Sequence, residues 1–319
     1  MREWIYLLGT FGIPLFFLVN GYLLGNRDLS FKYVLKKAGR YLLFMAEWSL
    51  LLTIPYLIKK EFRFFSLLKG AITGSDMLYH LWFLTGLIVI YLVLAIATVV
   101  CRAAGSEVKE FVKKKSCLIW CIALLTVVFI ANILMKIFTD AEIRDVIPAY
   151  LRIIDNGAYF VIGMHLKLNL DKSNDGDNFL QSWNGRLRGS RSLKIKCWLV
   201  VLLCYVIVCV VSELTGIIWA SSYYTLPIVT LAVVLMFLLL LTVNSGKISE
   251  RGYAVLMTST GVWILHPLVL RVIKKIYTML IGDVNLVASV LIMIVTIAVC
   301  IIAAMIVDKI KYVNRLFRP

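Results

Sequence analysis

The chain has 319 residues, of which 61% are hydrophobic and only 16% are charged, and its mean hydropathy is +0.90. A typical soluble domain carries about 25% charged residues, so this chain has too little polar material to cover the surface of a soluble protein. The composition therefore excludes a soluble enzyme, a disordered chain and a secreted disulfide scaffold. It predicts an all-α, polytopic membrane protein.

The net charge of +16 would indicate nucleic-acid binding in a soluble domain. Here the basic residues cluster in short segments between apolar runs, which is typical of the cytoplasmic loops of membrane proteins. We therefore expect no nucleic-acid partner. The seven cysteines lie in or beside apolar runs without a CxxC pair, which predicts free thiols. With three histidines in the chain, we predict no metal site.

Nine apolar runs reach the length of about 20 residues that a transmembrane helix needs. In chain order they cover residues 4–25, 41–58, 81–101, 116–138, 148–168, 197–214, 222–244, 253–273 and 285–307. The fifth run is exceptional because it contains Arg152 and Asp155. No small-residue cleavage site follows the first run, so it is predicted to be a retained helix. We expect about nine transmembrane helices in a single domain over residues 1–319.

Lysine and arginine are distributed unequally between alternate connecting segments, with 23 on one side and 9 on the other. The side richer in positive charge is cytoplasmic, which places the C-terminus inside and Met1 outside. The longest connection, residues 167–196, is then cytoplasmic. Its turn signals at 174–176 and 184–185 indicate a connecting loop and not a second domain.

Five stretches resemble motifs of the acyltransferase-3 family of integral membrane acyltransferases, in the family's order. Residues 13–24 (IPLFFLVNGYLL) are similar to its PLFF…SGYLL segment, and residues 31–40 (FKYVLKKAGR) to the basic run that follows. Residues 80–84 (HLWFL), 159–163 (YFVIG) and 263–268 (WILHPL) resemble three later motifs. The chain departs from the family at Asn20, where a serine is usual.

The resemblance implies an enzyme of about ten membrane helices in a bacterial inner or plasma membrane. It implies transfer of an acyl group, often acetyl, from cytoplasmic acyl-CoA to a hydroxyl of a cell-surface or lipid-linked saccharide. Acyl-CoA, with acetyl-CoA first, is then the co-substrate, and no bound cofactor is expected. The family normally opens with a further helix bearing a catalytic histidine. The sequence begins after that point, so we expect a truncated or mis-started chain, or a degenerate member.

Lys36, Lys37 and Arg40 lie at the cytoplasmic end of the second run. Lys36 and Arg40 are four residues apart and share a helix face. Cations at this position can hold the phosphates of acyl-CoA. The same residues also satisfy positive-inside topology or contact lipid headgroups, and the sequence leaves both readings open.

His80 and Trp82 begin the third run on the external side, where they form either an interfacial aromatic belt or an acceptor-binding site. His266 lies roughly 20 Å along the eighth run, counted from Tyr253, and the adjacent Pro267 frees a backbone carbonyl there. An ionisable group inside a span indicates function, although a neutral histidine bonded to another helix would be structural. Because acyl transfer needs a base with a pKa near neutrality, His80 and His266 are the candidate catalytic residues.

Arg152 and Asp155 are three residues apart and are predicted to pair on one helix face, as a structural pair or as the lining of a polar cavity. The segment at residues 13–24, which resembles a family motif, adds Asn20 and Tyr22 to the candidate substrate-binding residues. The predicted substrate-binding set is Lys36, Lys37, Arg40, Asn20, Tyr22, Trp82, Arg152 and Asp155.

Three functions are compatible with this sequence. The first is a membrane O-acyltransferase for an envelope polysaccharide. The second is a non-catalytic relative that exports or flips a polysaccharide or its precursor through the same cavity. The third is a membrane anchor or sensor paired with another protein, which the lack of a soluble domain in this sequence disfavours.

Overall fold

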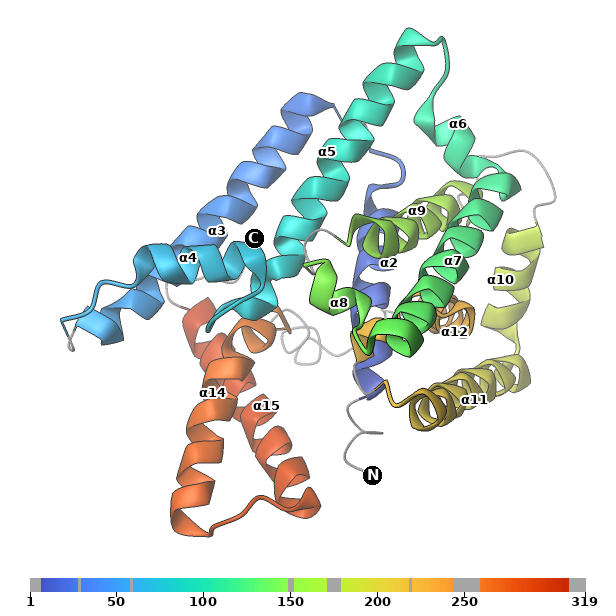
Figure 1. Ribbon diagram of the computed structural model, residues 1–319. Coiled ribbons are helices and arrows are strands. Elements are labelled where there is room, and N and C mark those ends of the chain that lie inside the picture. The colour runs from blue at the N-terminus through green and yellow to red at the C-terminus, as the bar shows by residue number, and fades with distance from the viewer. Residues whose placement is uncertain are drawn as a thin grey trace. The chain divides into compact units, whose positions relative to one another are not determined.

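The computed structural model describes residues 7–27, 30–57, 60–148, 152–170, 179–217, 220–243 and 259–309. Within these ranges the chain is helical nearly throughout and contains no strand, which confirms the all-α class (Figure 1). The predicted positions of Met1, Tyr253, the turn at 174–176 and the tail after residue 309 lie outside the described residues.

Each predicted apolar run overlaps a helix. In chain order these are η1 (Leu8–Phe11) with α2 (Gly12–Leu24), α3 (Phe31–Leu57), α5 (Trp82–Ala103), α7 (Lys115–Thr139), α9 (Ile153–Leu170), α11 (Arg191–Thr215), α12 (Pro227–Leu240), α14 (Ser259–Leu280) and α15 (Leu286–Asp308). Among the described residues, four helical segments are both long and apolar enough to cross a bilayer: Tyr79–Ala103, Lys115–Thr139, Arg191–Thr215 and Val287–Val307. The total of nine spans stays a prediction.

The apolar surface of these segments requires a lipid environment. In Val287–Val307 only 22% of the most apolar window is buried inside the protein, and side chains such as Leu291 and Ile302 are more than half exposed. Exposed apolar surface of this extent is stable in contact with lipid and not with water. The protein is therefore a multi-pass membrane protein.

Short helices occupy the segments that connect the predicted apolar runs. They are α4 (Phe64–Thr73), η2 (Tyr79–Leu81), α6 (Val108–Lys113), α8 (Ile143–Val146), α10 (Phe179–Gly189) and η4 (Ala220–Tyr223). The turn predicted at 184–185 is wrong, because these residues lie inside α10. Tertiary packing explains the difference: Leu187 of α10 is fully buried against Cys197 and Leu238, and this burial outweighs the local turn preference.

The described helices form two compact units. Unit 1 comprises residues 1–35 and 86–243, and unit 2 comprises residues 36–85 and 244–319. The single domain expected over residues 1–319 remains a prediction.

The packing of α2 against α9 organises unit 1 (Figure 1). A Cβ atom added to Gly21 would lie 1.9 Å from the Phe160 carbonyl oxygen, and one added to Gly163 would lie 2.0 Å from the Leu18 carbonyl oxygen. Gly21 and Gly25 are four residues apart, the spacing that lets helix backbones approach closely in membranes. The two backbones are therefore in direct contact, and glycine is required at this crossing.

Two buried polar side chains of α9 hold α6 in place. The His165 Nδ1 atom lies 2.7 Å from the Val112 carbonyl oxygen, and the Asn169 side-chain amide donates to the Lys113 carbonyl at 3.3 Å. Because a carbonyl oxygen only accepts, Nδ1 of His165 carries the proton. These two contacts attach the C-terminal end of α6 to α9.

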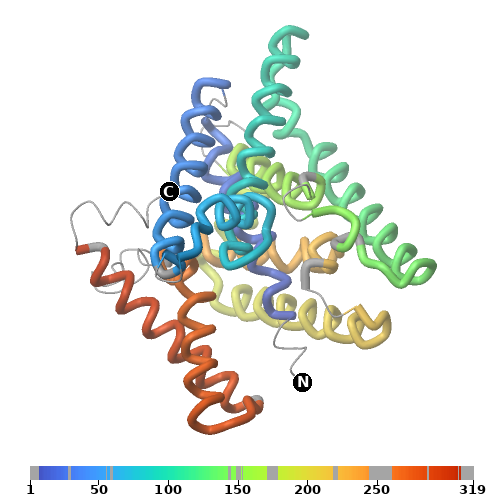
Figure 2. Tube along the Cα trace, turned by 60° about the vertical axis from the view of Figure 1, so that its left-hand side comes forward, coloured from blue at the N-terminus to red at the C-terminus, as the bar shows by residue number. Residues whose placement is uncertain are grey.

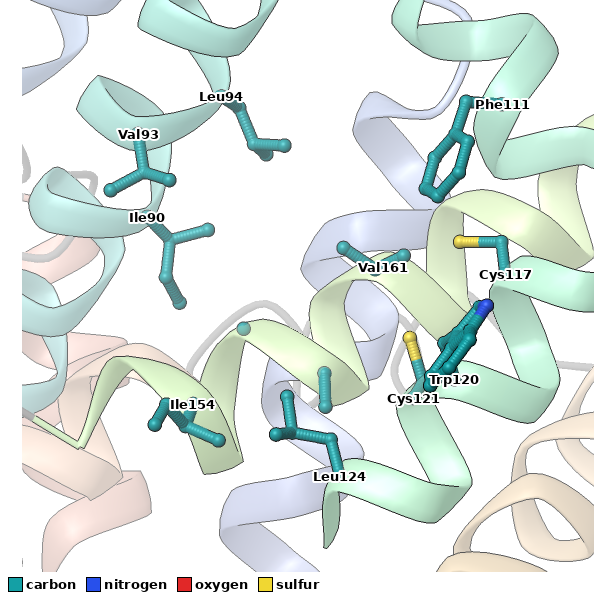
Figure 3. A pocket seen from close by; sticks show the side chains of 12 residues that line it. Ile90, Val93, Leu94, Phe111, Cys117, Trp120, Cys121, Leu124, Ile154 and Val161 are labelled. Atoms are coloured by element: carbon teal, nitrogen blue, oxygen red, sulfur yellow. The ribbon is translucent and has the colours of Figure 1, made fainter.

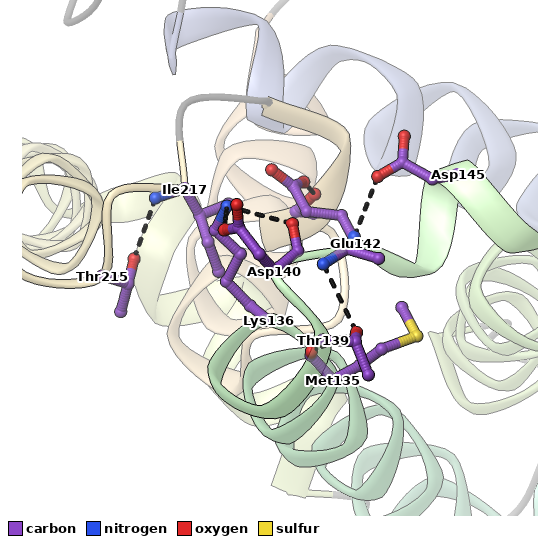
Figure 4. Close-up of polar contacts among 10 residues, drawn as sticks. Met135, Lys136, Thr139, Asp140, Glu142, Asp145, Thr215 and Ile217 are labelled. Atoms are coloured by element: carbon purple, nitrogen blue, oxygen red, sulfur yellow. Dashed lines mark hydrogen bonds and ion pairs between the residues drawn. The ribbon is translucent and has the colours of Figure 1, made fainter.

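An ion pair lies at the C-terminal end of α7 (Figure 4). Asp140 adopts a left-handed conformation with φ 55°, and its carboxylate lies 2.6 Å from Lys136 Nζ. The Lys136 ammonium holds the pKa of the Asp140 carboxyl below its ordinary value. Two residues further on, buried Glu142 accepts a hydrogen bond from the Ser222 hydroxyl. These contacts connect the ends of α7 and η4 in unit 1.

Unit 2 contains an antiparallel pair, α14 and α15, joined by the short turn after Leu280 (Figure 2). Asn285 begins α15, and its side-chain oxygen accepts a hydrogen bond from the Ala288 backbone N–H at 2.8 Å. Such an N-cap satisfies one of the free donors of the first helical turn. Pro267 lies inside α14, where it leaves one backbone carbonyl without its normal helical donor.

Candidate active site

The carbonyl that Pro267 releases is used by a neighbouring histidine. In a regular helix the N–H of residue 267 would donate to the carbonyl of residue 263, and proline has no N–H. His266 Nδ1 lies 2.6 Å from the Trp263 carbonyl oxygen. This contact confirms the prediction that Pro267 frees a carbonyl beside His266.

The contact with Trp263 determines the tautomer of His266. Since the carbonyl oxygen only accepts, Nδ1 of the neutral ring carries the proton and Nε2 carries the lone pair. The backbone thus orients the ring and leaves Nε2 as a proton acceptor. A histidine held in this way has the arrangement of a general base.

His80 lies beside this histidine in unit 2. The ring centroids of His80 and His266 are 5.9 Å apart, and His80 packs edge-on against Trp263 at 5.2 Å. Phe83 also packs edge-on against Trp263, at a centroid distance of 4.3 Å. The structure therefore brings together the two candidate catalytic histidines, which are far apart in the sequence.

The ring nitrogens of His80 are buried. His80 is 8% exposed, and neither Nδ1 nor Nε2 makes a hydrogen bond to a residue that the structure describes. A buried polar group without a full hydrogen bond is costly, and such cost is characteristic of sites that are completed by a ligand.

Sequence reasoning did not identify Trp263 and Phe83 as site residues. Trp263 supplies both the carbonyl that orients His266 and the ring that supports His80. One signal was available, because Trp263 is four residues before Pro267, the position whose carbonyl a proline releases. Trp82, which was predicted to bind substrate, precedes Phe83 and is half-buried. It lies close to Gly74, because a Cβ atom added to Gly74 would be 3.1 Å from the Trp82 Cβ.

A second polar cluster lies in unit 1 around the start of α9. Arg152 and Asp155 are both buried, and their opposite charges attract each other. Arg152 lies just before Ile153, the first residue of α9, and Asp155 lies in the first turn of that helix. The Arg152 carbonyl accepts the Asn156 N–H at 3.2 Å, which joins Arg152 to the first turn as its capping residue. The predicted pairing of the two charges stays a prediction.

Tyr159 extends this cluster one turn further along α9. Its fully buried hydroxyl donates to the Tyr224 carbonyl at 2.5 Å and contacts the Thr230 hydroxyl at 3.0 Å. Tyr159 belongs to the motif at residues 159–163, and the sequence alone predicted no role for it. A tyrosine within an apolar run needs a hydrogen-bond partner, and that need was the available signal.

The remaining predicted residues have separate surroundings. Asn20 donates to the Phe16 carbonyl of its own helix at 2.9 Å. Tyr22 packs against Phe237 at 4.9 Å between ring centroids, with Lys167 Nζ 5.3 Å from its ring. Both contacts belong to unit 1.

The basic residues at the start of α3 belong to unit 2. Lys36 and Arg40 are exposed, whereas Lys37 is half-buried with its Nζ 5.6 Å from the centre of the Tyr41 ring. Burial lowers the pKa of Lys37, and the charge of Arg40 lowers it further. The two exposed cations are accessible to an anionic ligand.

An apolar cavity of about 300 Å³ lies in unit 1 between α5, α6, α7 and α9 (Figure 3). Its lining includes Ile90, Phe111, Trp120 and the thiols of Cys117 and Cys121. All seven cysteines of the chain are free, as predicted. Among the described residues no group of three or more histidine, cysteine, aspartate or glutamate side chains could hold a metal ion.

Fold and site together define a multi-pass helical membrane protein with an oriented histidine pair in one unit and a buried charged cluster in the other. A family model described as an acyltransferase domain matches residues 1–305, so the chain belongs to the acyltransferase-3 family. It is a membrane acyltransferase of the kind that transfers groups other than aminoacyl groups. No curated protein and no solved structure matches the chain.

Proposed function

We propose that the protein is an O-acyltransferase that moves an acyl group, in the first instance acetyl, from acyl-CoA to a saccharide hydroxyl. The donor binds from the cytoplasmic side of a bacterial cell membrane, and the acceptor is a cell-surface or lipid-linked saccharide. The proposed topology has about nine spans and a cytoplasmic C-terminus. The observation that carries the proposal is the oriented His266 ring with its Nε2 lone pair, beside His80.

In the proposed reaction, His266 Nε2 takes the proton of the acceptor hydroxyl while that oxygen attacks the thioester carbonyl carbon. The C–S bond then breaks, the new C–O ester bond remains, and the proton passes from His266 to the departing thiolate. The products are an O-acyl saccharide and free CoA thiol, so atoms and charge balance. General base catalysis of this kind contributes about 10²–10⁴-fold to the rate.

His80 has a different role in the proposal. Its neutral ring carries one N–H, and this group makes no hydrogen bond to a described residue. A donor aimed at the thioester oxygen stabilises the negative charge that develops during attack. We assign His80 to this oxyanion and, through its contact with Trp263, to acceptor positioning.

Substrate binding is assigned to the other predicted residues. Exposed Lys36 and Arg40, with Lys37, are proposed to contact phosphates of the donor. Trp82 is proposed to stack on the acceptor sugar. Asn20, Tyr22, Arg152 and Asp155 are proposed to contribute to substrate binding.

The test uses membranes from cells that lack endogenous transfer activity and express the full chain. Labelled acetyl-CoA is supplied, and label in surface glycan esters is measured. His266→Gln should reduce transfer by about 10²-fold or more. Thr278→Ala is the matched control because it lies on the same helix, is exposed, and bonds only to the Lys274 carbonyl of its own turn in the described structure.

Transfer by the His266→Gln variant at the wild-type rate would refute His266 as the base. Wild-type membranes that form no ester but alter the export of a glycan would instead support the alternative, a non-catalytic exporter or flippase. Gel filtration of each variant in detergent verifies that it is folded before rates are compared.

A further inference from the structure

The apolar cavity between α5, α6, α7 and α9 has no role in the proposed acyl transfer. Its volume is about 300 Å³. Figure 3 shows Ile90 and Leu94 of α5 on one side of Val161, and Cys117 and Cys121 of α7 on the other. None of the described lining residues belongs to the predicted substrate-binding set.

The lining of this cavity favours hydrocarbon over water. Apart from the two thiols and the Trp120 indole, the described lining side chains carry no polar atom. Thiols behave as small, polarizable apolar groups. Water needs two to four polar partners to occupy a cavity, whereas a dry apolar cavity of about 150 Å³ already binds benzene. The larger cavity of this protein can therefore hold a segment of hydrocarbon chain.

The cavity opens on an apolar surface that faces lipid. Two of its lining side chains, Trp120 and Val93, are 70% and 47% exposed. Trp120 lies in Lys115–Thr139, one of the segments long and apolar enough to cross a bilayer. Along α7 the lining extends from Cys117 to Leu124, which is about 10 Å of helix. A lipid chain can therefore enter from the bilayer and lie along α7.

Three consecutive lysines lie at one end of the cavity. The lysines at 113–115 are exposed, and in the sequence they lie between Phe111 and Cys117, which both line the cavity. The segment 102–115 is predicted to be cytoplasmic. Basic sites between membrane helices on the cytoplasmic side bind anionic lipid headgroups. The apolar cavity and the adjacent cations therefore match the two parts of an anionic phospholipid.

We propose that this cavity holds one acyl chain of an anionic phospholipid of the inner leaflet, with the lipid phosphate at the lysines 113–115. Lipid tails are as apolar as the membrane-facing side chains, so a bound chain gains close packing and little hydrophobic free energy. Selection among lipids then comes from the headgroup, because lysine attracts phosphate as a point charge. The site is a lipid-binding site, and it does not depend on the proposed acyl transfer.

The experiment uses the full chain in nanodiscs of phosphatidylcholine. A small share of phosphatidylglycerol carries a photoreactive diazirine in one acyl chain, and a parallel sample contains phosphatidylcholine with the same chain. Peptide mass spectrometry measures label on residues 116–124 relative to label on α15, most of whose apolar window is not buried inside the protein. This ratio should be at least about fivefold higher for phosphatidylglycerol in the wild type, the factor that one lysine near the surface contributes.

Two valine variants test whether the chain occupies the cavity. Val161→Trp fills the cavity from α9. Val127→Trp is the matched control, because Val127 lies on α7, is 62% exposed and is not among the described lining residues. Label on residues 116–124 should fall to the level on α15 in the first variant and stay at the wild-type level in the second. If Val161→Trp does not fold, Val93→Trp replaces it, because Val93 also lines the cavity and is partly exposed.

Two triple variants test the headgroup contact. The first combines Lys113→Gln, Lys114→Gln and Lys115→Gln. The control combines Arg186→Gln, Arg191→Gln and Lys196→Gln, which removes the same charge from exposed residues of the predicted cytoplasmic segment 167–196. The first variant alone should lose the preference for phosphatidylglycerol. An equal loss in both would indicate a general effect of surface charge and would contradict the contact with residues 113–115.

Equal labelling of residues 116–124 and α15 by the phosphatidylglycerol probe in the wild type would overturn the proposal. Unaltered labelling in the variant that fills the cavity would also overturn it. Preferential labelling by a diazirine-bearing palmitoyl-CoA, without preferential labelling by phosphatidylglycerol, would assign the cavity to a long-chain thioester and refute the lipid. Labelling is measured without turnover, so a protein that transfers no acyl group can still confirm the lipid site.

Discussion

The crossing of α2 and α9 predicts a large effect from the smallest possible substitution, Gly163→Ala. The added Cβ would lie 2.0 Å from the Leu18 carbonyl oxygen and 2.8 Å from the Tyr22 nitrogen. Carbon and oxygen normally approach to about 3.3 Å, so the helices must separate by about 1.3 Å at this point. Overpacking of this kind costs about 1–3 kcal/mol of unfolding free energy.

Gly185→Ala is the matched control for this substitution. Gly185 also lies inside a helix, α10, and a Cβ there meets nothing within 4 Å. Alanine stabilises an exposed helical position by up to about 1 kcal/mol relative to glycine. The two variants should therefore change stability in opposite directions, although the chemical change is identical.

Both variants are unfolded with SDS in mixed micelles while helical circular dichroism is recorded. The reasoning predicts a lower midpoint for Gly163→Ala and an unchanged or higher midpoint for Gly185→Ala, relative to the wild type. Equal midpoints for the two variants would show that the backbones of α2 and α9 are not in the contact described.

Pro267→Ala restores a backbone N–H that competes with His266 for the Trp263 carbonyl. Acyl transfer should then fall by about fivefold, equivalent to one hydrogen bond of ~1 kcal/mol, while CoA binding is unchanged. Transfer at the full wild-type rate would show that other contacts orient the His266 ring. Replacing Lys36, Lys37 and Arg40 together by glutamine should raise the KM for acyl-CoA without preventing membrane insertion, and an unaltered KM would contradict their role. Asp140→Asn keeps the left-handed turn but removes the ion pair with Lys136. Because the folded-state pKa of Asp140 is lowered, the pair stabilises the fold above the usual aspartate pKa of about 3.9 and is lost as pH falls through the lowered value. Wild type and Asp140→Asn should therefore differ slightly in unfolding midpoint at neutral pH and converge in acid, and a gap that widens in acid would be inconsistent with this pair.

The histidine site shows what local sequence can and cannot predict. Pro267 indicated a free carbonyl near His266, because the absence of a backbone donor is a property of proline itself. The sequence contained no comparable signal for the contact between His80 and His266. That contact depends on how α14 packs near η2 within unit 2, and packing between distant segments is not encoded in a short window.

The basic residues also show which features the sequence predicts and which depend on tertiary packing. The repeated use of Lys and Arg between apolar runs predicts which segments face the cytoplasm. It does not predict that the lysines at 113–115 lie beside an apolar cavity of unit 1 while Lys36 and Arg40 belong to the other unit. Such a placement depends on the packing of α6, α7 and α9.

Hydropathy alone determined that this chain is helical and membrane-embedded, because a long apolar segment in lipid must satisfy its backbone hydrogen bonds within itself. Tertiary structure decided which polar side chains are buried together, and it converted predicted loops such as α10 into helices. The physical reason is that burial and charge proximity are properties of pairs of segments, and in this protein those segments lie far apart along the chain.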